Sequence, residues 1–225
     1  MESIVWQVYC SLGALFRARG YEQPSDYAPA PEQKPALLKT IAHTGFVACV
    51  ASSPAPASSV QSSSLAASSG APAKTRRLIV CVLDTAADYP AKVSEFKKFR
   101  SLLEQQFKLK TEAAPPIDCM LIGKQFSSAV AIEAAREEPK IRFSAHDYEV
   151  FQMPLFDCPY VPRQEIATGE DLAMLKAEYI DWRTLPKILA ADPACVWLGA
   201  EPGQLIKIWR LSETAGITIA YRLVV

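Results

Sequence analysis

The sequence has few of the side chains that build catalytic and metal sites. Its 225 residues include only two histidines, His43 and His146, and neither has other candidate ligands at short spacing. No two of the six cysteines lie within four residues of each other, which excludes a zinc site of the CxxC type. No glycine-rich phosphate loop and no GxSxG nucleophile elbow occurs. The sequence therefore predicts no catalytic residue, no metal site and no bound cofactor.

Long apolar runs and an excess of either charge are also missing. No run approaches the roughly 20 apolar residues of a membrane-spanning helix, and Glu2 stands where a signal peptide carries basic residues. Basic and acidic residues number 24 each, so the net charge indicates no general attraction to nucleic acid or membranes. We expect a soluble intracellular protein whose single cysteines lie in the core as small apolar side chains, in a reducing compartment.

The first 150 residues have the pattern of an α/β domain. Continuous apolar runs rich in β-branched residues predict two buried strands, over residues 77–83 and 117–123. Helical spacing and capping residues predict helices over residues 2–19, about 35–51, about 91–109, and from Ser127 or Ser128 to 138. The alternation of strand and helix indicates a sheet that helices cover on both faces.

A tract rich in serine and proline, "SSPAPASSVQSSSLAASSGAPAK", interrupts this pattern over about residues 52–74. It has almost no charge and few large apolar side chains, so it cannot bury enough surface to offset the entropy lost on ordering. We predict that this tract is a flexible insertion.

Residues 151–225 predict a smaller α+β domain. The three prolines of "FQMPLFDCPYVP" indicate an edge strand or an extended crossing. Thr168 and Asp171 form a capping-box pattern at the start of a helix. Three side chains of that helix are expected to be buried: Leu172, Leu175 and Tyr179.

Two further signals complete this smaller domain. Asp192 before a proline, with Gly199 as the stop, predicts a short helix. Apolar runs predict two closing strands, over residues 205–211 and 217–225. The loop "SETAG" joins these strands as a hairpin in which Gly216 can adopt a positive φ. Because the last strand ends on apolar residues, we expect it to be paired and covered rather than frayed.

Local charge gives one indication of nucleic-acid binding. Residues 74–110 contain nine lysines or arginines against four acids. A solvated helix face is the commoner explanation, but such a surface also binds DNA phosphates without reading sequence. Asp84, Glu95 and Lys97 resemble the metal-binding D…ExK arrangement of nucleases, although here Glu95 and Lys97 fall in a helical pattern instead of on a strand. A free DNA-binding or nuclease-like protein is therefore the alternative interpretation.

The last forty residues carry a specific resemblance. The segment "TLPKILAADPACVWLGAEPGQLIKIWRLSETAGITIAYRLVV" resembles the assembly domain of the fifth subunit of eukaryotic RNA polymerases and its archaeal counterpart. That family has LPRI, then DP, an aromatic residue before Gly, GQ, RPSETAG and a final YRLV. This chain matches the order and spacing of the pattern from Leu185 to Val224. Upstream, "RARGY" and "IDCMLIGKQFSSA" resemble the end of the first helix and a strand–helix junction of the family's N-terminal jaw domain.

The chain also departs from the family pattern. Lys187 replaces Arg, and two pairs of residues, 195–196 and 201–202, replace Ala-Arg and a basic pair. Leu211 replaces Pro, and Ile217 replaces an Arg after the glycine. Contacts that the missing basic side chains would make with acidic neighbours are not expected here. Such divergence suits a polymerase from a large DNA virus or an unusual protist.

The resemblance implies a non-catalytic structural subunit of a multisubunit DNA-dependent RNA polymerase. It implies a jaw domain over residues 1–150, with a sheet like that of restriction endonucleases, and an assembly domain over residues 151–225. The assembly domain would dock on the largest polymerase subunit, and the jaw would lie along downstream double-stranded DNA. The location would be the nucleus of a cell, or the host cytoplasm or nucleus and the virion for a viral polymerase. A regulatory protein that borrows the assembly domain to dock transiently is a further alternative.

Two sets of residues are the candidate sites. The expected partner interface, or the hairpin that supports it, comprises Arg210, Ser212, Glu213, Thr214, Tyr221 and Arg222, with a possible ion pair between Arg210 and Glu213 across the turn. The candidates for contact with the DNA backbone are Lys124, Gln125, Ser127 and Ser128, at a strand end and a helix N-terminus. An ordinary loop and helix cap is the alternative for this second set.

Overall fold

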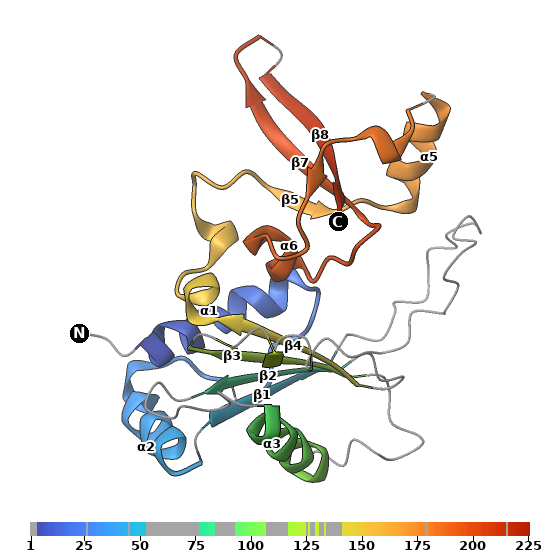
Figure 1. Cartoon of the computed structure of the whole chain (residues 1–225). Helices are drawn as coiled ribbons and strands as arrows, with labels where there is room; N and C mark the ends of the chain where they lie inside the picture. The colour runs from blue at the N-terminus through green and yellow to red at the C-terminus, as the bar shows by residue number, and fades with distance from the viewer. Residues whose placement is uncertain are drawn as a thin grey trace. The chain divides into compact units, whose positions relative to one another are not determined.

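The computed structural model describes two compact units of the chain (Figure 1). Of the described residues, those up to Met153 form the first unit and those from Pro154 form the second. The described residues are 4–25, 27–44, 46–52, 77–83, 93–106, 117–124, 126, 129–130, 133, 141–178, 180–214 and 216–225. The predicted Ser/Pro-rich insertion, except for Ser52, lies outside them.

The first unit is built on a four-stranded mixed sheet. Its strands are β1 (Phe46–Ser52), β2 (Arg77–Leu83), β3 (Ile117–Gly123) and β4 (Ile141–Asp147), in the order β1-β2-β3-β4. β1 runs antiparallel to β2, whereas β2, β3 and β4 are parallel. The two central strands, β2 and β3, are buried at nearly every position, as continuous apolar runs require. Both were predicted with these bounds, and the α/β class of this unit is confirmed.

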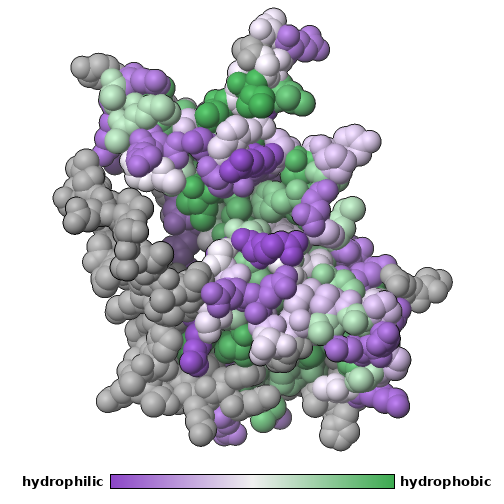
Figure 2. Space-filling model, turned by 180° about the vertical axis from the view of Figure 1, so that it is seen from behind, coloured by the Kyte–Doolittle hydropathy of each residue, from purple (hydrophilic) through white to green (hydrophobic). Residues whose placement is uncertain are grey.

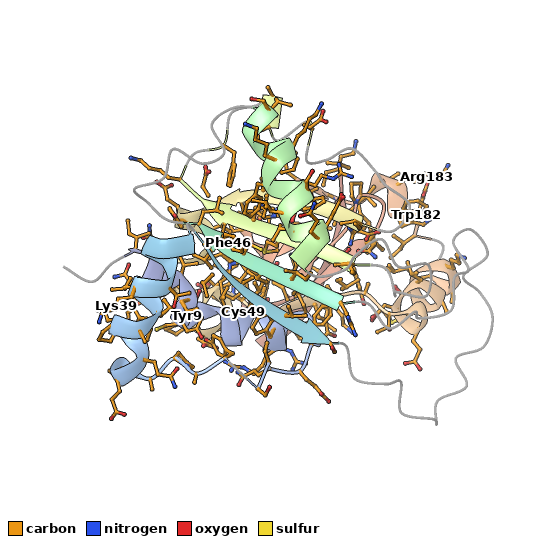
Figure 3. All side chains as sticks on the ribbon, turned by 90° about the horizontal axis from the view of Figure 1, so that it is seen from below. Tyr9, Lys39, Phe46, Cys49, Trp182 and Arg183 are labelled. Atoms are coloured by element: carbon orange, nitrogen blue, oxygen red, sulfur yellow. The ribbon has the colours of Figure 1, made fainter. Side chains whose placement is uncertain are left out.

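Helices cover both faces of this sheet. Figure 1 shows α1 (Ile4–Ala18) on one side and α3 (Val93–Gln106) on the other. α3 buries Phe96, Phe99 and Leu103 against alternate residues of β2 and β3. Phe46 of β1 meets Phe99 edge-on at 5.2 Å between ring centroids, and Cys49 follows on the opposite face of the strand (Figure 3). The sheet is thereby sealed from water on each side.

The structure corrects two predictions and adds a strand that was not predicted. The helix expected over residues 35–51 is α2 (Lys34–Thr44) followed by β1, because residues 46–52 gain a full antiparallel ladder with β2. β4 was not predicted, since as an edge strand it mixes exposed polar and buried apolar residues. The segment from Phe151 to Pro162, expected as an edge strand or an extended crossing, contains no strand. It begins with the last residue of a 3-10 helix, Tyr148–Phe151, and includes a second, Leu155–Asp157, near the start of the second unit.

The second unit is built on a smaller four-stranded sheet. Its strands are β5 (Gln164–Ile166), β6 (Lys187–Ile188), β7 (Leu205–Ser212) and β8 (Gly216–Val224), in the order β5-β7-β8-β6. β7 is antiparallel to both β5 and β8, and β6 is parallel to β8. α5 (Gly169–Ala177) packs Leu175 against Leu205 and Leu223. On the other face, α6 (Pro193–Leu198) packs against Ile206 and Ile208 of β7 and Val224 of β8. A further 3-10 helix spans Trp182–Thr184 (Figure 3).

Local signals of the second unit were read correctly from the sequence. Thr168 and Asp171 form both bonds of the capping box. Asp192 caps α6, and Gly199 ends it with a φ of 70°. Leu172, expected to be buried, is exposed, because the buried residues of α5 are Asp171 and Leu175. Tyr179 lies outside the described residues.

The apolar end of β8 is paired, as expected. The N–H of Leu223 donates to the carbonyl of Pro186, and the N–H of Val225 donates to the carbonyl of Ile188. Leu223 and Val224 are both buried. The strand end is therefore held by hydrogen bonds on both edges, since the N–H of Val224 donates to the carbonyl of Gln204 on the β7 side, and by the core on both faces.

Candidate functional site

The strands β7 and β8 extend beyond their neighbours in the sheet. β5 pairs with β7 only as far as Ile208, and β6 pairs only with Leu223 and Val224. Beyond this, residues 209–212 and 216–219 pair with each other as a two-stranded ribbon, which we call the distal ribbon. Figure 1 shows it projecting from the rest of its sheet, and Gly216, with a φ of 71°, closes its turn as predicted.

One face of the distal ribbon is apolar and exposed. Cross-strand partners share a face, and the register pairs Trp209 with Ile219 and Leu211 with Ile217. Leu211 is 91% exposed, Ile217 is 67% exposed and Ile219 is 47% exposed. Figure 2 shows apolar side chains gathered close to the end of this ribbon. The two departures from the family pattern, at positions 211 and 217, therefore face each other across the ribbon.

Cations hold the tryptophan at the base of this face. The guanidinium of Arg163 lies 4.6 Å from the centroid of the Trp209 ring, and the ammonium of Lys207 lies 5.2 Å from it. The N–H of Trp209 also donates to the carbonyl of Arg163. Cation–π contacts of this kind are worth about 0.5–1 kcal/mol each at exposed sites. They fix the ring beside Ile219.

On the same face, α5 covers the base of the hairpin, and the buried carboxylate of Asp171 lies where this cover ends. Asp171 of α5 accepts hydrogen bonds from the Lys207 ammonium (2.7 Å), the Tyr221 hydroxyl (3.0 Å) and the Thr168 hydroxyl and N–H (both 2.9 Å). Burial alone would raise the pKa of Asp171, but these donors outweigh it and lower the pKa to about 2. Burial, and then the hydrogen bond to Asp171, raises the pKa of Tyr221 to about 12. Asp171 thus fastens α5 to both strands of the hairpin.

The six predicted interface residues are divided between different parts of the hairpin. Arg210, Ser212 and Arg222 project from the polar face, opposite the apolar one. Glu213 and Thr214 form the turn. Tyr221 lies on the other face and binds Asp171, so it supports the hairpin from within.

The expected ion pair between Arg210 and Glu213 does not form. No contact within 4.0 Å joins these two described side chains. Glu213 lies in the turn, beyond the last residue of β7, so the alternation of the strand does not bring it to Arg210. The turn is instead accompanied by a 3.4 Å contact between the hydroxyls of Ser212 and Thr214. The sequence places Ile217 and Ile219 on one face of the last strand. Reasoning from it missed that Trp209 and Leu211 extend this face across β7 and that the face is exposed.

The predicted DNA-contact residues are only partly described. Lys124 is exposed and follows directly after β3. Gln125, Ser127 and Ser128 lie outside the described residues. The ring of Phe126 lies 2.9 Å from the position that a Cβ on Gly123 would occupy, so the chain needs glycine where it leaves the strand. Lys124 is thereby presented at the end of a rigid parallel strand.

The nuclease-like motif does not assemble in the described residues. Asp84 lies outside them, and Glu95–Lys97 belongs to α3, as the helical pattern predicted. Phe96 is fully buried, and Lys97 forms an ion pair with Glu133 at 3.5 Å. Within the described ranges no three potential metal ligands cluster, and no helix is long and apolar enough to cross a membrane.

Similar proteins match the sequence of the second unit. The family model of the RNA polymerase Rpb5 C-terminal domain matches residues 156–224. The DNA-directed RNA polymerase subunit Rpo5 of Thermococcus kodakarensis is 47% identical over 72 residues, which are 32% of this chain and 88% of that protein. The chain belongs to the Rpb5/Rpo5 family of DNA-directed RNA polymerase subunits. Rpo5 of Methanococcus vannielii, another archaeal member, is 42% identical over 66 residues, 29% of this chain and 85% of that protein.

Viral members of the Rpb5/Rpo5 family match a longer part of the chain. The DNA-directed RNA polymerase RPB5 homolog of African swine fever virus is 31% identical over 107 residues, 47% of this chain. The match spans about half (52%) of that viral protein. The resemblance stated from the last forty residues is therefore confirmed, and relatives from a large DNA virus agree with the expected kind of source. The distal ribbon lies within the residues that the family model matches.

Proposed function

We propose that this Rpb5/Rpo5 family member is a non-catalytic structural subunit of a multisubunit DNA-dependent RNA polymerase. Residues 151–225 form its assembly domain, which docks on the largest subunit. Residues 1–150 form a jaw domain, like a restriction endonuclease in its sheet, which lies along downstream double-stranded DNA. The protein would reside with its polymerase, in a nucleus or, for a viral enzyme, in the host cytoplasm or nucleus and the virion.

The exposed apolar face of the distal ribbon is the observation that carries this proposal. Leu211 and Ile217 stay largely exposed side by side, so they bury little apolar surface within their own unit. Apolar surface removed from water stabilises a complex by about 25 cal/mol per Å², and a contiguous exposed patch is typical of a protein–protein contact. The Asp171 network holds the hairpin that presents this face. A projection that is anchored at its base and carries an apolar face is suited to permanent docking.

Purification of the tagged chain from its native source tests this proposal. We expect the two large polymerase subunits to be recovered at equal stoichiometry after washing at high salt, because apolar contacts are not weakened by screening. Loss of the polymerase at high salt would favour a transient regulatory role. Recovery of the chain alone would favour the free DNA-binding interpretation.

The contact with DNA is tested separately at Lys124. Its ammonium would neutralise one phosphate of downstream DNA, so Lys124→Ala should weaken binding by the assembled polymerase for all sequences alike. The slope of log affinity against log salt should fall by about 1. Lys176→Ala, which removes an exposed lysine from α5 in the other unit, is the matched control. An unchanged slope in the Lys124 variant would remove this residue from the DNA interface.

A further inference from the structure

The outer edge of β8 carries backbone groups that no described strand covers. β6 covers only the end of the edge, where Leu223 and Val225 donate N–H groups outward to Pro186 and Ile188. Alternate residues of a strand direct their N–H and C=O groups to the same edge. The backbone groups of Ile217, Ile219 and Tyr221 therefore point outward as well. The residues between them pair with β7, as the N–H of Val224 does with the carbonyl of Gln204 at the base of the hairpin.

The side chains beside this edge differ on the two faces of the ribbon. Ile217 and Ile219 flank the edge on the apolar face, with Leu211 and Trp209 one strand behind. On the polar face Arg222 flanks the edge, and small residues, Gly216, Thr218 and Ala220, leave open space beside it. Arg222 forms no ion pair within 4.0 Å in the described part of the chain. An edge of this kind fits an extended segment with apolar side chains on one face and an acidic one on the other.

We propose that the edge of β8 from Ile217 to Tyr221 binds an extended segment of the polymerase partner as an added strand. The inference rests on the proposed function and names how the partner is held. The segment's backbone bonds to the outward groups of Ile217, Ile219 and Tyr221, as in other recognition by strand addition. Its apolar side chains pack beside Ile217 and Ile219, and a carboxylate on its other face pairs with Arg222.

Charge favours a different chain over a second copy of this one. The sequence of β8, GITIAYRLV, contains no acidic residue. An edge-to-edge pair of two β8 strands would leave both Arg222 guanidinium groups without a carboxylate from the opposing strand. An exposed edge flanked by large apolar residues also promotes aggregation unless it is covered. A partner strand covers the edge and supplies the missing charge.

Amide hydrogen exchange resolved to single residues tests the proposal. The full chain is measured alone and within the purified polymerase. In the isolated chain the amides of Ile217, Ile219 and Tyr221 should exchange rapidly, while those of Thr218 and Ala220 are protected by β7. In the polymerase the first three should slow by at least about tenfold. Equal rates in both states would overturn the added strand while leaving the proposed subunit role intact.

Two substitutions at Ile219 distinguish the contribution of its backbone N–H to binding from that of its side chain. Ile219→Pro removes the outward N–H without removing a bond to β7, whereas Ile219→Ala removes side-chain contact and keeps the N–H. We expect recovery of the chain with the polymerase to fall at least about tenfold for the proline variant, and clearly less for the alanine variant. Equal losses would overturn a backbone contact at this edge. Should the proline variant misfold, shown by altered tryptophan fluorescence, the exchange measurement still decides.

The remaining outcomes also decide the matter. Slow exchange of the three outward amides in the isolated chain, with a dimer in solution, would overturn the proposal in favour of a second copy. Recovery of the chain without polymerase would overturn both the proposed function and this inference. Slowed outward amides in a polymerase that retains the chain would support both.

Discussion

The two units of this chain use their apolar residues differently. In the first unit, α1 and α3 seal both faces of the sheet, and Phe16, Phe96 and Phe99 are fully buried. The second unit is smaller, yet it contains nine of the twelve exposed large apolar side chains among the described residues. Its helices cover only the base of the β7–β8 hairpin. Among the described residues, the first unit therefore buries most of its large apolar side chains, whereas the second leaves many of them exposed.

Removing a large side chain from the core of the first unit should have the largest effect on stability. Phe96→Ala removes a fully buried ring that packs against Phe143 at 5.8 Å between centroids. We expect the free energy of unfolding of this unit to fall by about 3–5 kcal/mol. Amide hydrogen exchange in β2 and β3 measures this free energy of unfolding.

The second unit supplies the internal control for that substitution. Three of the four tryptophans, Trp182, Trp197 and Trp209, belong to it, so tryptophan fluorescence chiefly reports its unfolding. This signal should keep its midpoint in Phe96→Ala. A shift of equal size in both signals would show that the two units unfold together, and the contrast between them would be lost.

The sequence predicts best those elements whose burial is uniform or whose caps are local. β2 and β3 are buried on both faces, so their apolar runs are continuous and their bounds were predicted. The capping box of α5 and the proline–glycine pattern of α6 act within a few residues. β1 and β4 were misread or missed because edge strands depend on neighbours distant in sequence. Pairing of that kind leaves only a weak local signal.

The hairpin that carries the candidate residues was predicted, but its organisation was not. The hairpin was identified from "SETAG" and its flanking strands, and the residues named there lie on it. The sequence did not reveal that Tyr221 would bind Asp171, fifty positions away, because only the register of β7 and β8 brings Lys207 and Tyr221 to one carboxylate. Nor did it show where α5 stops covering the strands. Both depend on tertiary packing.

Acid should weaken the first unit in a pH range set by His146. Burial and, after it, the nearby Arg19 lower the pKa of His146 from 6.5 to about 4. Below pH 6.5 His146 is protonated in the unfolded chain but stays neutral in the folded chain. The free energy of unfolding is therefore highest above pH 6.5 and falls as the pH approaches 4. The loss amounts to at most about 3 kcal/mol. Urea unfolding followed by circular dichroism at pH 7 and pH 4.5 measures it.

A neutral replacement separates this effect from general acid sensitivity. His146→Gln takes up no proton in either state, so the fall in stability between pH 7 and pH 4.5 should be much smaller. The same fall in both proteins would show that another group of the first unit is responsible.

The stability of the second unit should fall at a lower pH than that of the first unit, and by a smaller amount. The pKa of Asp171, lowered from 3.8 to about 2, means that its stabilisation is present above pH 4 and is lost as pH falls toward 2. We expect Asp171→Asn to reduce the stability of this unit at pH 7 by about 2 kcal/mol. Tryptophan fluorescence in urea measures the change.

An exposed neighbour on the same helix provides the control. Glu170→Gln removes an equal charge from the first turn of α5 without touching β7 or β8. It should change stability by less than about 0.5 kcal/mol. If both substitutions cost the same, the helix dipole rather than the hairpin network would explain the loss.

The smallest effect on stability is expected where the apolar side chains are most exposed. Leu211→Ala and Ile217→Ala should each change the free energy of unfolding by less than about 0.5 kcal/mol, because neither side chain belongs to a buried cluster. Leu102→Ala, at an exposed position on α3, should be as mild. The difference should appear in the polymerase, from which the two ribbon variants dissociate at lower salt than the Leu102 variant. If all three variants stay bound to the polymerase alike, the exposed apolar residues of the second unit contribute no more to binding than those of the first. If only the ribbon variants are lost, the surface that contributes nothing to folding is the one that contributes to assembly.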